Sequence, residues 1–438
     1  MFGRLHPLKS LLVGYAIYVV IGWALLCLPF SHQDGGVAAI DHLFTATSAV
    51  STTGLATVST PTTYSFFGEI VILSMIQFGG IGYMTLGSFI LLARRQDLTP
   101  RREEIARLAF VLPENYNVKS IIRNVVLFTV LIETAGAIAL YMAFRGAAAG
   151  GVEIDNVLWQ SIFHSISAFC TAGFSLFPDS LVRFVDNVWV NGIIATLSLC
   201  GAIGFLVLSD VYNSFVGQKK RQSLTTRIIL YATVWTILIG WVGLFLMEPS
   251  FASMESTEQR LMASGFQAMT AMTTVGFNTT DFATLSPAPI LLVLLLMILG
   301  ASPSGTGGGL KSTSVSAALA TVWSVIHGRP KVTFWGCEVP EHRLITAFAS
   351  VVFYVGIFFV GGLLLLALQP HAFEDVLFET ASALGTVGIS RGITGELTPL
   401  SKLVVIVLMF IGRVGPITFG LAVMSGAMPL DDKDDLAI

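Results

Sequence analysis

Charged residues are scarce in this chain. They make up only 12% of 438 residues, whereas 54% are hydrophobic, and an ordinary soluble domain has about 25% charged residues. So few charges cannot cover the surface of a water-soluble fold of this length, which indicates that membrane lipid solvates most of the chain. The formal net charge of −3 lacks the basic excess that nucleic-acid binding requires, so we expect no nucleic-acid partner.

Cysteines are also few, and catalytic motifs are missing. The four cysteines, Cys27, Cys170, Cys200 and Cys337, form no C-x-x-C pair, which excludes a disulfide framework and a zinc ribbon and predicts small buried side chains. No H-E-x-x-H motif, nucleophile–base pair or pair of aspartates lies in an apolar segment, so the sequence does not favour an enzyme. No G-x-G-x-x-G follows a strand, so nucleotide regulation would have to come from a partner.

Long and short apolar segments alternate along the chain. A bilayer-spanning helix needs about twenty apolar residues, and eight segments reach that length: 9–30, 67–93, 120–144, 187–215, 226–247, 288–326, 343–368 and 401–425. The first has no small-residue cleavage site after it, so we interpret it as a retained helix rather than a signal peptide. A shorter segment lies between the two members of each pair, at 41–54, 159–173, 262–276 and 375–388.

This alternation predicts an all-α polytopic membrane protein. Its eight spanning helices and four re-entrant pore helices would form four helix–pore loop–helix repeats in a pseudo-fourfold arrangement around one pore. The predicted repeats cover residues 1–115, 116–222, 223–330 and 331–438, which together form a single membrane pore domain.

Lysines and arginines are distributed unevenly between the two ends of these segments. The N-terminus and the loops after the second, fourth and sixth long segments hold most of them. By the positive-inside rule, both termini are cytoplasmic and the four short segments lie on the outer side. We therefore expect Ser180 and Thr394 outside the membrane, and Gln96 and Gln222 inside.

The four short segments share a sequence motif. Aligned on their last glycine, they read DHLFTATSAVSTTG, QSIFHSISAFCTAG, ASGFQAMTAMTTVG and DVLFETASALGTVG. The common pattern is F-x3-[ST]-A-x2-T-x-G, and five matched positions in four copies are a strong sign of an internal repeat.

The T-x-G ending of each short segment suits an ion filter. Backbone carbonyls that follow a short helix can replace the hydration shell of a cation, as in potassium channels, and the helix aims its partly negative C-terminal end at the ion. The alternative is ordinary helix-ending chemistry between packed helices. The predicted filter residues are Thr52, Thr53, Gly54, Thr171, Ala172, Gly173, Thr274, Val275, Gly276, Thr386, Val387 and Gly388.

With these four segments, the sequences ASPSGTGGGLKSTS at 301–314 and MFIGRVGPITF at 409–419 resemble the Trk/Ktr/HKT superfamily of potassium transporters, most closely the bacterial KtrB type of ion-conducting subunit. Trk-type relatives usually carry an additional helix pair before the first filter, for which this chain has no room. The resemblance implies potassium-selective uptake, because relatives with glycine at all four filter positions are typically potassium-selective and those with serine in the first repeat tend toward sodium. A sodium-conducting or Na⁺/K⁺-symporting relative is the alternative, and sodium is the alternative ion.

The resemblance also implies partners and a location. Such subunits form homodimers in the bacterial plasma (inner) membrane. They sit on cytoplasmic ring subunits of the KtrA/TrkA kind, which carry the nucleotide-binding domains. Membrane lipid surrounds the dimer.

The sixth long segment contains a glycine-rich interruption. Pro303 and five glycines between 300 and 309 cannot continue a helix cheaply, and the resemblance assigns this stretch to an intramembrane gate loop below the third filter. A static kink is the alternative. The predicted gate residues are Gly305, Thr306, Gly307, Gly308, Gly309, Lys311 and Arg413.

Charged and polar residues within the apolar segments are also candidates for function. Arg413 lies near the middle of the last segment and is predicted to face the pore, with a buried pair to Glu133 or Glu379 as the alternative. Glu133 itself is interpreted as a structural hydrogen-bonding residue. Lys311 pairs with a carboxylate or snorkels, and both options stay open. His164 and Gln267 are expected to brace the short helices.

Overall fold

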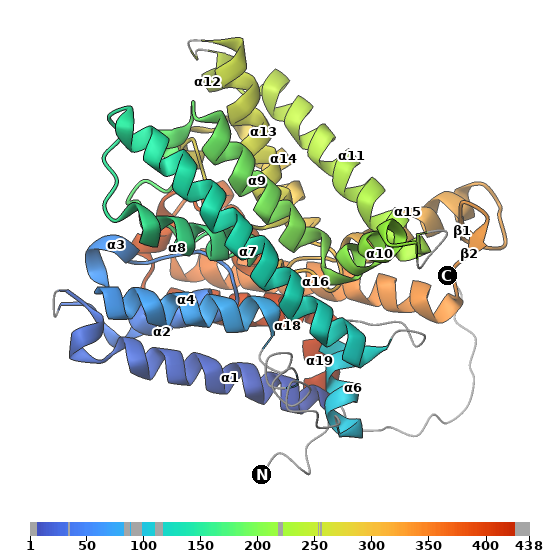
Figure 1. The fold of residues 1–438 in the computed structure, drawn as a ribbon. Coiled ribbons are helices and arrows are strands. Elements are labelled where there is room, and N and C mark those ends of the chain that lie inside the picture. Colours follow the sequence, from blue (N-terminus) through green and yellow to red (C-terminus); the bar gives the residue numbers. More distant parts are fainter. Residues whose placement is uncertain are drawn as a thin grey trace.

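The fold is described from a computed structural model (Figure 1). It describes residues 7–33, 36–82, 88, 99–109, 117–217, 222–252, 254 and 256–424. Several predicted features lie outside these ranges: Gln96 with the adjacent part of its basic loop, most of the second long segment beyond residue 82, the stretch 218–221 and the C-terminus after 424. Within them the fold is helical, apart from a hairpin of β1 (Thr333–Phe334) and β2 (Cys337–Glu338).

The long and short helices recur in the predicted order in each quarter of the chain. We call the quarters repeats 1 to 4. Repeat 1 contains α1 (Pro7–Leu26), α2 (Ala39–Val50), α3 (Thr60–Thr63), α4 (Phe66–Ile81) and α6 (Pro100–Ala109). Repeat 2 contains α7 (Val118–Ala149), α8 (Val157–Phe169), α9 (Val188–Ile203) and α10 (Phe205–Phe215).

The second half of the chain repeats this order. Repeat 3 contains α11 (Leu224–Met247), α12 (Pro249–Ala252), α13 (Thr257–Thr273), α14 (Pro287–Ile298) and α15 (Ser312–Ile326). Repeat 4 contains α16 (Glu341–Leu368), α17 (Phe373–Gly385), α18 (Pro399–Val414) and α19 (Pro416–Met424). Four single-turn 3₁₀ helices, at Pro29–Ser31, Val182–Phe184, Phe282–Thr284 and Ile393–Glu396, lie in the connecting loops.

The first helix of every repeat is long and apolar enough to cross a membrane. Among the described residues these four are Leu8–Leu26, Val118–Ala149, Leu224–Met247 and Glu341–Leu368. Their outer surfaces expose large apolar side chains such as Leu131, Trp235 and Phe359, which fits the predicted contact with membrane lipid. Figure 1 shows α3 and α12 at one end of the molecule and the β1–β2 hairpin at the other.

The two long segments predicted at 187–215 and 401–425 are each broken by a sharp bend. α9 and α10 meet at 97°, and α18 and α19 meet at 99°. The linking residues, Gly204 (φ 87°) and Gly415 (φ 92°), have left-handed backbones that no helix continues, and Pro416 cannot donate a helical hydrogen bond.

The predicted burial of the cysteines is only partly right. Cys170 is buried and Cys200 half-buried, but Cys27 and Cys337 are exposed. Cys27 follows the end of α1 and Cys337 lies on the hairpin, so neither position belongs to a packed helix face.

Contacts at the loop side of the pore helices link each repeat to the next. Trp159 donates to Glu69 at 2.6 Å between repeats 2 and 1, and the Leu181 amide donates to Asn278 at 3.0 Å between repeats 2 and 3. Arg391 donates to the Phe282 carbonyl, and Lys402 forms an ion pair of 2.5 Å with Asp41. These ties close a ring in the order 1-2-3-4-1.

Candidate ion filter and gate

Each pore helix ends in the same backbone turn. The amide of the residue before the motif glycine donates to the carbonyl five residues earlier in all four repeats, with distances of 2.8 to 3.2 Å: Thr53–Ser48, Ala172–Ser167, Val275–Thr270 and Val387–Ser382. The motif threonines, Thr52, Thr171, Thr274 and Thr386, all have a positive φ of 50° to 59°. Four copies of a backbone that side chains rarely adopt mark a shared, constrained function.

The four motif glycines form a closed ring. A Cβ on each would stand less than 3.0 Å from the carbonyl oxygen that precedes the glycine of the next repeat: Gly54 meets Ala172, Gly173 meets Val275, Gly276 meets Val387 and Gly388 meets Thr53. We call these four oxygens the carbonyl ring. Only glycine fits such a close approach of backbones. Unrelated helix ends would not close a cycle, so this geometry favours a filter over the helix-packing alternative.

The motif hydroxyl six residues before the glycine supports the turn unequally. Ser48 Oγ accepts the Gly54 amide at 3.0 Å, and Ser382 Oγ accepts the Gly388 amide at 3.1 Å. Ser167 Oγ instead donates to the Phe174 carbonyl at 2.8 Å. The hydroxyl therefore fixes the glycine amide directly in repeats 1 and 4.

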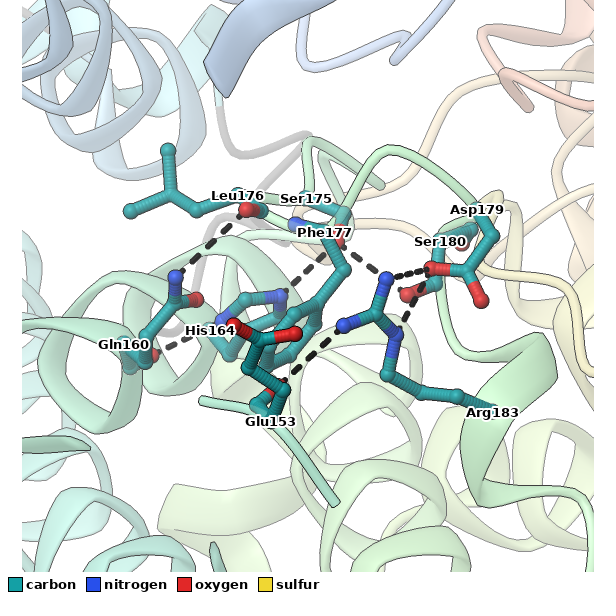
Figure 2. A network of polar contacts seen from close by, with 9 residues as sticks. All are labelled: Glu153, Gln160, His164, Ser175, Leu176, Phe177, Asp179, Ser180 and Arg183. Carbon is teal, nitrogen blue, oxygen red and sulfur yellow. Dashed lines mark hydrogen bonds and ion pairs between the residues drawn. The ribbon is translucent and has the colours of Figure 1, made fainter. Parts of the chain in front are cut away.

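His164 and Gln267 were predicted to brace the short helices, and in the structure both reach the chain that follows their filters. His164 Nδ1 lies 2.8 Å from the Gln160 carbonyl and Nε2 lies 2.9 Å from Ser175 Oγ, as Figure 2 shows. The Gln267 side-chain amide forms a hydrogen bond of 2.6 Å with the Thr280 hydroxyl.

Glu379 belongs to the same set, which the sequence reasoning missed. It occupies the equivalent position of repeat 4, nine residues before the glycine, and is fully buried. Its carboxyl group accepts the hydroxyls of Ser390 at 2.8 Å and Thr394 at 2.6 Å. In the aligned motifs, Glu379 stands in the same column as His164 and Gln267, and this shared polar position could have identified it. Thr394 is consequently buried, although it was expected to be an accessible outer position.

The glycine-rich stretch is an open loop and not a kinked helix. Residues 299–311 separate α14 from α15, and Ser304 (φ 62°) and Gly309 (φ 73°) have left-handed backbones. Two backbone hydrogen bonds attach the loop to repeat 2. The Ser302 amide donates to the Ala202 carbonyl at 3.0 Å, and the Thr306 amide donates to the Gly201 carbonyl at 3.1 Å. The stretch is therefore a loop and not a kink within one helix, and its role as a gate stays a prediction.

Three consecutive residues of this loop lie against all four motif threonines. Thr52 Oγ1 donates to the Thr306 carbonyl at 3.3 Å, and Thr171 Oγ1 donates to Thr306 Oγ1 at 3.1 Å. A Cβ on Gly307 or Gly308 would collide with the hydroxyl of Thr274 or Thr386. The loop thus lies against the motif threonine of every repeat.

Arg413 joins this loop to repeat 1. Its Nη1 donates to the Thr306 carbonyl and to Thr52 Oγ1, and its Nη2 donates to the carbonyls of Gly79 and Gly80. The alternative pair with Glu133 or Glu379 is wrong in the described part of the chain. Arg413 is instead held entirely by backbone carbonyls and one hydroxyl.

Glu133 and Lys311 have different partners. Glu133 accepts the Gln77 amide at 3.0 Å, which agrees with its structural interpretation. Lys311 Nζ donates to the Gly307 carbonyl at 2.7 Å, so it neither pairs with a carboxylate of the described residues nor snorkels away from the loop.

A second repeat, G-x-x-G, lies on the helices behind the filters and was not noticed in the sequence. It occurs at 79–82, 201–204 and 412–415, and repeat 3 has Gly300 to Pro303 in its place. The first glycine of the three G-x-x-G copies packs on the carbonyl of Val50, Phe169 or Leu384, four residues before a filter glycine. Aligning the second long segments would have revealed it. The residue after this glycine is Gly80, Ala202, Ala301 or Arg413, so only repeat 4 has a large side chain there.

Comparison with known proteins places the chain in a family. Residues 26–428 match the family model described as TrkH, cation transport protein. The chain is 36% identical to Ktr system potassium uptake protein B of Bacillus subtilis over 95% of its own length and 92% of the relative. It is also 30% identical to potassium/sodium uptake protein NtpJ of Enterococcus hirae, over 95% and 92% of the two lengths.

The fold has a solved counterpart. The crystal structure of the potassium transporter TrkH from Vibrio parahaemolyticus matches with a TM-score of 0.74, covering 97% of this chain and 86% of the other at 22% identity. The chain therefore belongs to the TrkH family of cation transport proteins, and the resemblance inferred from its motifs is confirmed.

Proposed function

We propose that this protein is the translocating subunit of a Ktr/Trk-type system and that it takes up K⁺ selectively, in a channel-like manner, across the plasma membrane. The carbonyl ring is the observation on which the proposal rests. Four backbone oxygens, one from each repeat, stand against the motif glycines in a closed cycle, and such a ring can replace the hydration shell of a monovalent cation. The potassium uptake relatives support the choice of ion.

The membrane potential supplies the driving force. It is worth about 2.3 kcal/mol per charge per 100 mV, which corresponds to roughly fiftyfold accumulation of a monovalent cation. The described residues contain no cluster of three or more His, Cys, Asp or Glu side chains that could hold a resident metal ion. In this proposal K⁺ is the cargo.

The glycine-rich loop and Arg413 form the gate. The loop covers the four motif threonines, and Arg413 places a fixed positive charge next to them. Opening requires the Thr306 carbonyl to leave both Arg413 and Thr52. Movement of the adjacent α15 and α19 from the cytoplasmic side would draw the loop and the arginine apart.

A regulatory partner is expected to cause that movement. Relatives named as proteins of a Ktr system support a multi-subunit assembly, in which this chain forms a homodimer on a cytoplasmic ring of nucleotide-binding subunits. The test is potassium uptake in a transport-deficient bacterial strain, with and without a KtrA-type ring subunit. Growth on low potassium only with both subunits supports the proposal, and no uptake in either case contradicts it.

Sodium conduction is the second candidate, since one relative is named a potassium/sodium uptake protein. Glycine at all four filter positions favours potassium. Bi-ionic flux measurements on purified protein in liposomes separate the two, because a potassium filter gives faster ⁸⁶Rb⁺ than ²²Na⁺ entry and a sodium pathway gives the reverse.

A further inference from the structure

A cavity of about 200 Å³ lies below the gate, on the side of the glycine-rich loop away from the carbonyl ring. Its walls come from α1, α4, α6, α10, the glycine-rich loop, α15, α16 and the α18–α19 junction. Since one water takes about 30 Å³ in the liquid, a space of this size holds a small ion together with several waters.

The charged side chains that line this cavity are both positive. They are Lys311 and Arg413, and no aspartate or glutamate is among the described residues of the wall. Among the described residues, Lys311 Nζ donates to one acceptor, the Gly307 carbonyl at 2.7 Å, which leaves two of its three donors for a ligand. Two cations without a carboxylate are an unusual lining for the path of a cation.

Two helices add positive potential at the same wall. α15 begins at Ser312 and has no side-chain cap, and α19 begins at Pro416 directly after the bend. Their first turns, which include Ser314 and Thr418, line the cavity. A helix N-terminus carries unsatisfied amides and about half a positive charge, and such half-helix ends receive anionic groups in other membrane transporters.

Hydroxyl donors complete the set. The Ser314 amide donates to the Lys311 carbonyl at 2.8 Å, but the side-chain hydroxyls of Ser314 and Thr418 have no hydrogen-bond partner in the part of the chain that the structure describes. Both residues line the cavity. Lys311, these two hydroxyls and the two helix ends therefore present donors to one space that offers little negative charge in return.

We propose that the closed gate holds a small inorganic anion of the halide type in this cavity, bound by Lys311, Ser314 and Thr418 within the field of Arg413. The anion neutralises the two cations and stabilises the arrangement in which the loop covers the filter. Withdrawal of the loop carries Lys311 away from Arg413 and dissolves the site. Binding of the anion stands on the cavity alone, whereas its effect on potassium flux rests on the proposed gate.

Bromide is the probe, because its anomalous scattering locates it directly. Crystals of the full-length protein soaked in bromide should show an anomalous peak in the cavity within hydrogen-bonding distance of Lys311. The melting temperature in detergent should also be higher in potassium chloride than in potassium gluconate at equal ionic strength, because gluconate is too large for the cavity. No peak at this position, or equal melting temperatures, would overturn the proposal.

Matched variants test the assignment of residues. Lys311→Gln keeps a donor for the Gly307 carbonyl but removes the charge, and should weaken bromide binding by about tenfold, as the loss of one close ion contact predicts. Thr418→Val should weaken it less and serves if Lys311→Gln does not fold. Arg329→Gln removes an exposed cation outside the cavity and should leave binding unchanged. Equal bromide affinity in wild-type and Lys311→Gln protein rejects the assignment.

The potassium readout separates this inference from the proposed function. Bromide in the cavity of a protein that conducts no potassium would leave the anion site standing and reject the transport proposal. Potassium flux without bromide in the cavity would do the opposite. With both present, raising chloride on the cytoplasmic side should lower the potassium flux of wild-type protein and not that of Lys311→Gln.

Discussion

The carbonyl ring and the layer directly beneath it are built by the four repeats in different ways. Every repeat contributes the same backbone oxygen and the same glycine to the ring. In the layer beneath, repeat 3 alone contributes a loop and repeat 4 alone contributes an arginine, where the other repeats have Gly80, Ala202 and Ala301. Equal coordination from all sides suits ion selection, whereas a gate needs one part that can move relative to the others. The comparison therefore supports the proposal that the symmetric layer selects the ion and the asymmetric layer gates its passage.

Crowding the symmetric layer should have the largest effect. In Gly388→Ser, the new Cβ would collide with the Thr53 carbonyl, and relieving such overpacking costs about 1–3 kcal/mol, so we expect potassium uptake to fall at least tenfold. Gly392→Ser is the matched control, because Gly392 also has a positive φ but has open space around it. Equal losses in the two variants would trace the defect to backbone strain and not to the ring.

Removing the charge from the asymmetric layer should raise potassium uptake, whereas crowding the ring lowers it. At about 5 Å and an effective dielectric constant of 20, Arg413 repels a potassium ion by about 3 kcal/mol, roughly a hundredfold effect on occupancy. Arg413→Ala, or a shortened 302–309 loop, should therefore raise maximal uptake and reduce its dependence on the regulatory subunit. Arg413→Lys, which keeps the charge, should change the flux less. Lost uptake in well-folded Arg413→Ala protein would make this residue a structural anchor instead.

A milder change in the ring should alter selectivity more than rate. Gly54 leaves its neighbouring carbonyl slightly more room than the other three motif glycines, so Gly54→Ser should retain transport while the potassium-to-sodium flux ratio falls. Paired ⁸⁶Rb⁺ and ²²Na⁺ influx into liposomes measures this ratio. An unchanged ratio would remove this loop from the filter.

The brace behind the fourth filter should contribute to stability. Glu379→Ala loses two hydrogen bonds, to Ser390 and Thr394, and should lower the free energy of unfolding by about 2 kcal/mol. Glu374→Ala on the exposed side of the same helix should change it by less than about 0.5 kcal/mol. Denaturant unfolding in detergent measures both, and similar values would mean that the buried contacts contribute nothing.

The variants that test the orientation of the chain should change transport least, because each replaces one loop residue with cysteine. A membrane-impermeant thiol reagent added outside should label cysteine at Ser180 or Gly395 and not at Gln222, in a background without the native cysteines. Gly395 is chosen as the outer labelling position instead of Thr394, because Thr394 is buried and Gly395 is exposed. Outside labelling at Gln222 would reverse the predicted orientation and the assignment of inner and outer sides.

The sequence predicted the symmetric layer much better than the asymmetric one. A motif that is present four times is easy to recognise, and its T-x-G ending pointed to the backbone carbonyls that stand against Gly54 and its equivalents. The sharp bends at Gly204 and Gly415 were missed because a hydropathy pattern depends on composition alone. It stays apolar on both sides of a bend and does not record a change in helix direction. The hydrogen-bond partners of Arg413 could not be predicted either. They are backbone carbonyls of Gly79, Gly80 and Thr306, and every residue type has a backbone carbonyl.

Thallium is the most direct probe of the central claim that the carbonyl ring is a potassium filter, because Tl⁺ resembles K⁺ in size and scatters anomalously. Crystals grown in a thallium salt should show an anomalous peak on the axis of the ring, equidistant from the carbonyl oxygens of Thr53, Ala172, Val275 and Val387, and excess potassium should displace it more readily than sodium. Thallium bound only elsewhere, or displaced equally by the two ions, would contradict the account.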